Sequence, residues 1–460
     1  MPLPACFVPA DSPALPLHLV DLAGFPAWKD AQAPHTRAWI EAHGFKGDAL
    51  SVLVLPGADG APAAAVAGIA DPADPASLGH LPALLPPLAF RIAADSPRAV
   101  PPDCAVLGWG LGAYRFTRYL KTSKPTALLA IDASAQAEAL AVLAASTQVR
   151  DLVNTPTEHM GPDELEAVVH ALATAHGAGF RCLRGPELLA QNFPAIHAVG
   201  RASHRAPRLI ELTHGDAALP HLVIVGKGVC FDTGGLDVKP ADGMRHMKKD
   251  MGGAAHAIAL ARLVLERRLP VRLSLLVPAV ENALGPEAYR PGEVIATRSG
   301  LSVEIDNTDA EGRVILGDAL VYAAEQTPAL VMDFATLTGA ARIALGPDLP
   351  ALFTNRDELA TAYLDAGAAL RDPLWRMPLW RPYLSYLKSG IADLANAGPS
   401  RMAGCVTAAL YLERFLPDAQ AWTHVDVYSW NDADRPGKPA GGEAQGLRAA
   451  WGFLKARFGA

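Results

Sequence analysis

The chain has 460 residues, half of them hydrophobic, and a formal net charge of −7 at pH 7. This length fits two or three domains, and the apolar fraction is too high for an intrinsically disordered chain. The acidic balance shows no basic footprint for nucleic acid. No apolar run reaches the roughly 18 residues that a membrane-spanning helix needs, so we expect no membrane partner.

The cysteines favour a reducing compartment. There are five of them, widely spaced, and no two form a Cys-x-x-Cys pair. Neither a disulfide framework nor a zinc knuckle is therefore indicated. The first residues also lack the basic and apolar regions of a signal peptide. We expect reduced thiols and a cytoplasmic location.

Residues 1–132 have the signals of a smaller N-terminal α/β domain. The apolar runs Ser51–Gly57 and Cys104–Gly112 meet glycine turns, so both are predicted to be strands. Between them, the proline-rich stretch His80–Pro102 is predicted to be irregular surface structure, because proline removes backbone donors and ends regular elements.

Helix-forming residues then predict a linker helix over 133–154, and helix and strand signals alternate from residue 155 to 460. The clearest predicted helices here are Pro162–Ala178 and Gly253–Arg268. The clearest predicted strands are Leu209–Leu212, His221–Gly226, Val271–Val280 and Ala329–Asp333. Such alternation predicts strands that pair in parallel between layers of helices. The predicted fold class is α/β, with a larger C-terminal α/β/α domain around a central mixed, largely parallel sheet.

Two short stretches, Lys227–Asp250 and Asn307–Arg313, concentrate acidic residues and lysines. Each follows a predicted strand, and sites in such sheets gather beyond the carboxyl ends of strands. Two metal ions repel each other, so carboxylates that bridge them are needed. The residues placed to hold a pair of divalent metals are Lys227, Asp232, Asp250, Asp309 and Glu311. Lys239 and Arg313 remain free to act on a substrate.

Each candidate also has a purely structural alternative. In an extended segment Asp309 and Glu311 would lie on one side, but Asp309 could instead be the acidic N-cap of a helix. Lys227 would have to be neutral to coordinate a metal, and otherwise it is a solvated lysine in a glycine turn. Asp250 could belong to a surface charge cluster, although the small apolar residues after it favour a buried helix start. Arg313 could pair with Glu311 or Asp309, or bind a planar oxyanion.

Four motifs resemble, in order and spacing, the leucyl aminopeptidase (cytosol aminopeptidase) family: VGKGVCFDTGGLDVKP, MKKDMGGAA, NTDAEGR and DFATLTGA. Together with RDLVNTP, ENALGPEAYRPGEV and AGCVTAALYLERF, the resemblance covers most of residues 150–455. Residues 1–130 match more weakly. The segment Asp426–Gly446 differs from the commoner family sequence, which leaves the side-chain preference open.

The resemblance implies a metal-dependent aminopeptidase that releases N-terminal residues, preferably Leu or Met, from peptides with a free N-terminus. It implies two divalent ions, zinc or manganese, and a bridging water as nucleophile. One ion would take Lys227, Asp232, Asp250 and Glu311, and the other Asp232, Asp309, Glu311 and the Asp309 carbonyl. Lys239 would stabilise the oxyanion, and Arg313 would hold a bicarbonate ion as general base.

The resemblance also implies a substrate pocket lined by Met247, Thr336 and Gly339, and a homohexamer. Two alternatives on the same fold are a nucleic-acid-binding regulator and a catalytically inactive scaffold. The acidic composition argues against the first, and the complete set of candidate ligands argues against the second.

Overall fold

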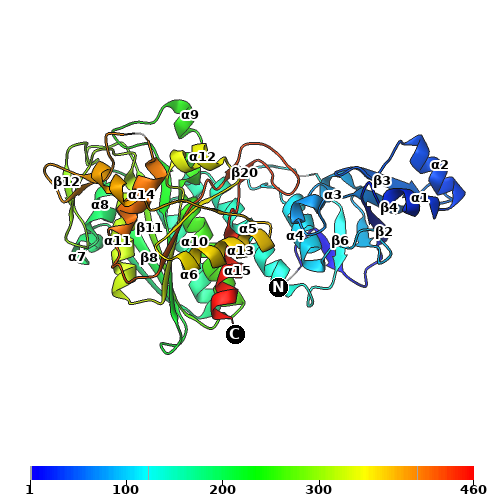
Figure 1. The fold of residues 1–460 in the computed structure, drawn as a ribbon, viewed down its shortest axis with the longest axis horizontal. Coiled ribbons are helices and arrows are strands. Elements are labelled where there is room, and N and C mark those ends of the chain that lie inside the picture. The colour runs from blue at the N-terminus through cyan, green and yellow to red at the C-terminus, as the bar shows by residue number, and fades with distance from the viewer. Residues whose placement is uncertain (1–2, 123, 401, 460) are drawn as a thin grey trace. The chain divides into compact units, whose positions relative to one another are not determined.

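The structure, a computed structural model, describes residues 3–122, 124–400 and 402–459. The chain divides into two compact units (Figure 1). The smaller is Met1–Thr147 with Asn431–Ala440, and the larger is Gln148–Trp430 with Gly441–Ala460. The sequence did not predict that a late segment joins the smaller unit, and the domain limits at 132 and 154 stay a prediction. In the described part of the chain, we find no helix with the length and apolarity to cross a membrane.

The smaller unit contains a six-stranded sheet with the order β1-β6-β5-β2-β4-β3. Neighbouring strands are parallel except β3, which is antiparallel to β4. The strands are β1 (Phe7–Pro9), β2 (Leu15–Val20), β3 (Val52–Pro56), β4 (Pro62–Gly68), β5 (Ala89–Ile92) and β6 (Leu128–Ile131). The helices are α1 (Phe25–Asp30), α2 (Pro34–Ala42), η1 (Pro75–Leu78), α3 (Leu81–Leu84) and α4 (Pro102–Ala113), and α5 (Ala137–Asn154) follows.

Two predictions for this unit were wrong. Cys104–Gly112 lies inside helix α4 and is not a strand. A Cβ at Gly108 would lie 2.3 Å from the carbonyl oxygen of Pro75, so this glycine allows close packing of α4 on η1 and does not mark a turn. The stretch His80–Pro102 is only partly irregular, because it contains α3 and the strand β5, whose Phe90 is fully buried.

The larger unit is built on a mixed sheet with the order β16-β15-β18-β14-β9-β11-β8-β7, and β10 also pairs with β11. Strands β18, β14, β9 and β11 are parallel, whereas β15 and β8 run antiparallel to their neighbours in this group. The strands are β7 (Gly179–Arg184), β8 (Arg208–His214), β9 (His221–Gly226), β10 (Gly228–Asp232), β11 (Arg272–Asn282), β14 (Leu330–Ala335), β15 (Ala351–Thr354), β16 (Trp375–Arg376) and β18 (Trp422–Asp426). The predicted mixed, largely parallel sheet is confirmed.

Helices cover both faces of this sheet. Figure 1 shows β8 and β11 between α6, α10 and α15 on one side and α8, α11 and α14 on the other. The helices are η2 (Thr157–His159), α6 (Pro162–His176), α7 (Pro186–Ala190), α8 (Pro194–Gly200), α9 (Ala241–Met244), η3 (Met247–Met251), α10 (Gly252–Glu266), α11 (Glu311–Glu325), α12 (Gly339–Leu345), α13 (Asp357–Ala369), η4 (Arg381–Leu387), α14 (Gly404–Glu413) and α15 (Leu447–Phe458). All six residues of β9 are buried, as expected for a strand covered on both faces.

Short strands lie outside this sheet. Strands β12 (Val294–Ala296), β13 (Ser302–Glu304) and β17 (Leu394–Ala395) form a three-stranded sheet, and β19 (Trp430–Asn431) pairs with β20 (Gly441–Gly442). The second acidic stretch therefore follows a strand of a small separate sheet, whereas the first follows the central one. The helices and strands predicted after residue 155 are confirmed, with ends that differ by a few residues.

The start of α10 packs on β14 with no room for a side chain. A Cβ at Gly253 would lie 2.2 Å from the carbonyl oxygen of Phe334, and one at Gly226 would lie 2.6 Å from Cα of Ala254. The glycines thus hold the η3–α10 junction close to the carboxyl ends of β9 and β14. This packing positions Asp250, which lies in η3.

Candidate metal centre

The five predicted metal ligands come together at one edge of the central sheet. Lys227 follows β9, Asp232 ends β10, and Asp250 lies in η3. Asp309 precedes α11, and Glu311 is the first residue of that helix. The site lies beyond the carboxyl ends of parallel strands, where ligands bind in sheets of this kind.

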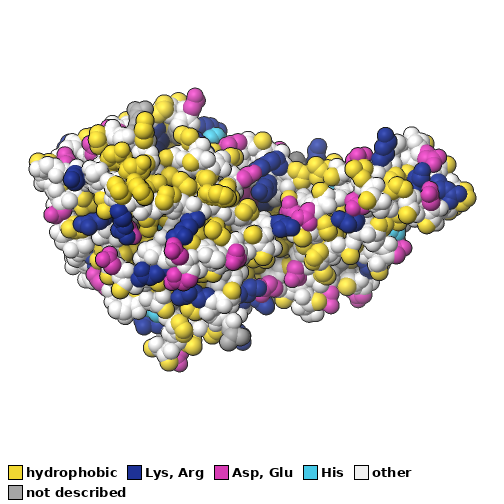
Figure 2. Space-filling view, in the orientation of Figure 1, with side chains coloured by type: hydrophobic (Ala, Val, Ile, Leu, Met, Phe, Trp, Pro, Cys, Tyr) yellow, Lys and Arg dark blue, Asp and Glu magenta, His cyan; other side chains and the backbone are white. Residues whose placement is uncertain are grey.

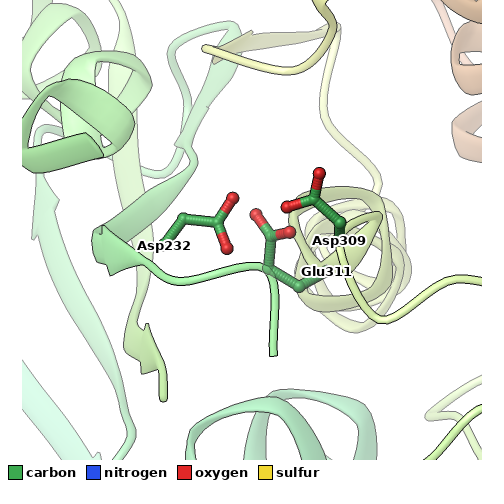
Figure 3. A group of neighbouring side chains, drawn as sticks. All are labelled: Asp232, Asp309 and Glu311. Carbon is green, nitrogen blue, oxygen red and sulfur yellow. The ribbon is translucent and has the colours of Figure 1, made fainter. Parts of the chain in front are cut away.

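Asp232, Asp309 and Glu311 each present a carboxylate oxygen within 4.8 Å of the others, and Figure 3 shows the three groups facing one another. The backbone N–H of Gly234 and the amide of Asn282 each donate to Oδ1 of Asp232 at 2.8 Å. Burial, and next the charge of Asp232, raise the pKa of Glu311 well above its usual range and that of Asp309 to about 6. Such mutual repulsion favours binding of a divalent cation.

Lys227 is only 3% exposed, so it is not a solvated turn lysine. Its ammonium lies 2.8 Å from Oδ2 of Asp250 and 3.0 Å from Oε1 of Glu311, and it donates to the carbonyl of Thr336 at 2.8 Å. Burial opposes its charge, but the two carboxylates outweigh burial and raise the pKa of Lys227. The lysine would have to release its proton to become a metal ligand.

Asp309 and Glu311 meet at a loop-to-helix junction and not in an extended segment. Helix α11 begins at Glu311, and its N-cap residue is Ala310, so no side chain at the N-cap accepts a hydrogen bond from the helix. The N–H of Asp309 donates to Oδ1 of Asn307 at 2.8 Å, whereas its carboxylate pairs with Lys239. The alternative of a helix start is correct, but the Asp309 carboxylate does not cap the helix.

Lys239 lies on the more exposed side of the cluster, with 15% of its side chain exposed. Its ammonium is 2.8 Å from Oδ2 of Asp232 and also pairs with Asp309. Burial acts against its charge, yet these carboxylates raise the pKa of Lys239. It therefore remains a cation beside the carboxylates.

Arg313 is buried in the first turn of α11. Its Nη1 donates to the carbonyl of Asn396 at 2.8 Å, and its buried Nε has no hydrogen-bond partner among the described residues. Within the same set of residues, no ion pair joins Arg313 to Glu311 or Asp309. An unpaired donor on a planar guanidinium group suits a planar oxyanion.

One of the three pocket candidates contacts the cluster directly. Oγ1 of Thr336 donates to Oδ1 of Asp250 at 2.8 Å, and its carbonyl accepts from Lys227. Met247 is half-buried at the start of η3, and Gly339 begins α12. A Cβ at Gly339 would meet no atom within 4 Å, so the space beside it is open.

The residues that hold the acidic loop 306–309 were not predicted from the sequence. The carbonyl of Thr308 accepts from Nδ2 of Asn282 at 3.0 Å and from the hydroxyl of Tyr289 at 2.7 Å. Oδ1 of Asn396 accepts two backbone N–H groups of the same loop. Asn282 and Tyr289 lie within ENALGPEAYRPGEV, so that motif was an available signal, whereas nothing near Asn396 pointed to the site.

The residues fit divalent metal ions. Oε2 of Glu311 is buried and has no hydrogen-bond partner in the described part of the chain. The carboxylates gathered here are those of Asp232, Asp250, Asp309 and Glu311, and the ammonium groups are those of Lys227 and Lys239. The four carboxylates with Lys227, the predicted ligands, form an oxygen-rich set with one nitrogen, and such a set accepts zinc, manganese or magnesium.

A largely buried acidic centre at the carboxyl edge of an α/β sheet is typical of metal-dependent enzymes. The family model described as "Cytosol aminopeptidase family, catalytic domain" matches residues 147–450, and "M17 aminopeptidase, N-terminal domain" matches residues 15–132. The chain belongs to the cytosol aminopeptidase family, and it is an aminopeptidase, a hydrolase of peptide bonds.

Individual relatives agree with this assignment. A "Probable cytosol aminopeptidase" of Syntrophotalea carbinolica is 41% identical over 378 residues, which cover 77% of this chain and 76% of that protein. Among solved structures, a cytosol aminopeptidase from Coxiella burnetii is similar with a TM-score of 0.95 and 46% identity, covering 98% and 99% of the two chains. The bottromycin maturation enzyme BotP in complex with Mn is similar with a TM-score of 0.87 and 32% identity, covering 96% and 99%.

Proposed function

We propose that this aminopeptidase removes N-terminal residues, Leu or Met by preference, from peptides with a free N-terminus in the cytoplasm. The observation that carries the proposal is the largely buried cluster of Asp232, Asp309 and Glu311, in which Oε2 of Glu311 has neither a hydrogen-bond nor an ion-pair partner among the described residues. The names of the relatives support the reaction and the compartment.

Two divalent ions would be held by this chain, one by Lys227, Asp232, Asp250 and Glu311, and the other by Asp232, Asp309, Glu311 and the Asp309 carbonyl. When bound, such ions lower the pKa of water and polarise a carbonyl group. The complex of BotP with Mn supports manganese, and zinc is the other candidate.

Two cations of the chain would act on the reacting atoms. Lys239, held between Asp232 and Asp309, would donate a hydrogen bond to the peptide carbonyl oxygen as its negative charge develops. Arg313 would orient a bicarbonate ion through its unpaired Nε, and that ion would supply a general base.

The pocket residues support an apolar preference. Met247 is apolar, Gly339 leaves open space, and Thr336 is tied to Asp250 beside the cluster. The first side chain of a peptide would lie against these residues while its amine lies at the carboxylates.

We also propose that the chain assembles as a homohexamer. Figure 2 shows hydrophobic side chains gathered on the face of the larger unit where α12 and α14 lie in Figure 1. Ile343 of α12 is 84% exposed, and Trp380 and Met402 are also exposed. Exposed apolar groups that gather on one face mark a protein interface.

A metal-reconstitution assay tests the proposal. The protein is freed of metal with a chelator, loaded with Mn²⁺ or Zn²⁺, and assayed with Leu-p-nitroanilide and its N-acetyl derivative. We expect two ions per chain by elemental analysis, cleavage only by the loaded protein, and no cleavage of the acetylated substrate. A loaded protein without activity would favour the scaffold alternative, and a salt-dependent gel shift would favour the nucleic-acid alternative.

A further inference from the structure

A largely buried lysine next to the metal centre has no hydrogen-bond acceptor among the described residues. Lys249 lies in η3 between Met247 and Asp250, and it is 8% exposed. No hydrogen bond or ion pair joins its ammonium to any residue that the structure describes. Its Nζ lies 4.9 Å from the centroid of the Tyr428 ring. An aromatic face attracts a cation but offers no lone pair to its N–H groups, so an acceptor from water or from a ligand is needed.

A second cation shares the same ring. Cζ of Arg342, on α12, lies 4.8 Å from the centroid of Tyr428. Arg342 is exposed, and its guanidinium group too makes no hydrogen bond or ion pair within the described residues. Two positively charged side chains therefore converge on one half-buried tyrosine.

The carboxylate in the hollow beside Arg342 is already engaged. Asp426 lines a small hollow together with Arg342, Tyr428 and Thr338. Its Oδ1 accepts the N–H groups of Leu337 and Thr338, and its Oδ2 accepts the hydroxyl of Thr338. No ion pair joins Asp426 to either cation, so its carboxylate serves to hold the loop before α12.

The two cations belong to the same two elements as two of the proposed pocket residues. Lys249 is two residues from Met247 in η3, and Arg342 is three residues from Gly339 in α12. A ligand that lies between these elements would bring an acceptor to both cations. An apolar side chain offers no such acceptor, whereas a carboxylate accepts charge-assisted hydrogen bonds from an ammonium and from a guanidinium group.

We infer that Lys249, with Arg342 nearer the solvent, binds a carboxylate of the peptide substrate. The inference rests on the proposed peptidase function and specifies a substrate group for it. The carboxylate has two possible sources, an acidic side chain of the N-terminal residue or the C-terminus of a dipeptide. If the carboxylate is that of a side chain, the enzyme accepts acidic N-terminal residues as well as apolar ones. If it is the C-terminus, the enzyme favours dipeptides whatever their first residue.

Two substrate pairs test the inference and separate the sources. Glu- and Gln-p-nitroanilide differ only in the side-chain carboxylate, and Leu-Gly and Leu-Gly-amide differ only in the terminal one. We expect the wild type to prefer the acid in one pair by about 10- to 100-fold in kcat/KM, the range for a hydrogen bond to a buried charge. Lys249→Met should abolish that preference. Because the ratio is taken within one variant, a general loss of rate cancels.

Lys248→Met is the matched control. Lys248 is the neighbouring lysine, and its ammonium already donates to the carbonyl of Asn154 at 2.6 Å, so the acid preference should persist in this variant. An enzyme that cleaves Leu-p-nitroanilide but prefers the acid in neither pair, or keeps its preference in Lys249→Met, overturns this inference alone. Failure to cleave Leu-p-nitroanilide with any metal overturns the proposed function and the inference with it.

Discussion

The ammonium of Lys227 lies 3.0 Å from Oε1 of Glu311, and both side chains are almost fully buried. The contact depends on Gly312, because a Cβ at that position would lie 2.5 Å from Cε of Lys227. The lysine ammonium thus supplies positive charge that offsets the repulsion between the neighbouring carboxylates. Binding of divalent ions there would exchange the lysine proton for a metal, which makes the affinity for metal dependent on every carboxylate in the cluster.

The first prediction is that Glu311→Gln loses at least one metal ion per chain. Its activity should fall more than about 100-fold, the upper limit for loss of a residue that merely supports a ligand. Elemental analysis and Leu-p-nitroanilide kinetics measure the two effects. Glu325→Gln, at the exposed end of the same helix, should keep both metals and activity. A Glu311→Gln enzyme with two metals and normal rate would show that this carboxylate is not a ligand.

A second prediction concerns Lys239→Ala. The variant should keep its metals, because the carboxylates remain, but its kcat should fall about 10²–10³-fold, as expected when one group that stabilises an oxyanion is removed. Metal content and kcat are measured on the same preparation. Loss of metal from this variant would instead give Lys239 a structural role between Asp232 and Asp309.

The third prediction concerns Arg313→Ala, which removes the unpaired Nε donor. This variant should also keep its metals and lose rate, since its base would no longer be held in place. Added bicarbonate should stimulate the wild type in bicarbonate-free buffer and should partly restore Arg313→Ala. Equal rates with and without bicarbonate in both proteins would argue against a bicarbonate site.

The sequence predicted the ligand cluster because its residues lie in two short stretches with marked glycine and acidic patterns. Roles that depend on distant contacts were not predictable in this way. Asn396 acts through backbone hydrogen bonds, which leave no pattern in the residues around it. Lys249, next to another lysine, resembled part of a surface charge cluster, and only the folded chain brings Tyr428 to it.

The wrong prediction of a strand at Cys104–Gly112 also arose because the role of these residues depends on contacts with distant parts of the chain. An apolar run with alternating glycines predicts a strand that meets a turn, whereas these glycines allow close contacts of a helix. In the larger unit the long apolar runs, such as β9, were predicted correctly, because burial on both faces leaves a pattern within the strand itself.

The fourth prediction is that Asp318→Asn destabilises the larger unit without altering the metal centre. Oδ2 of Asp318 accepts the N–H groups of Ala195 and Ile196 at the start of α8, and Oδ1 accepts that of Arg298 at 2.7 Å. In the variant, the new side-chain NH₂ group would face one of these N–H groups and leave it without an acceptor. A buried unsatisfied group of this kind lowers the free energy of unfolding by about 1–3 kcal/mol. Urea unfolding measures the loss.

Asp365→Asn is the control for that experiment, because Asp365 is exposed on α13 and should change stability by less than about 0.5 kcal/mol. The metal content of both variants should equal that of the wild type. Equal stability of Asp318→Asn and the wild type would show that the carboxylate is not needed to cap α8.

The fifth prediction concerns pH and the buried pair of His424 and Asp333. Nδ1 of His424 lies 2.5 Å from Oδ1 of Asp333, whose Oδ2 accepts from the indole N–H of Trp422 at 2.6 Å. Burial alone would lower the pKa of His424, but the Asp333 carboxylate outweighs burial and raises it. The ion pair therefore stabilises the fold fully below about pH 6.5, the ordinary pKa of histidine, and less as pH rises through the raised value.

Asp333→Asn removes the partner of that charge. At pH 6 the substitution should lower the free energy of unfolding by about 3–5 kcal/mol, the cost of leaving a buried charge without its partner. At pH 9 the cost should be smaller, because His424 is then closer to neutral in the wild type and less of the ion pair is lost. Urea unfolding of both proteins between pH 6 and pH 9 gives this difference, from which effects of pH on the rest of the chain cancel. A cost that stays constant or grows toward pH 9 would show that His424 carries no charge in the fold.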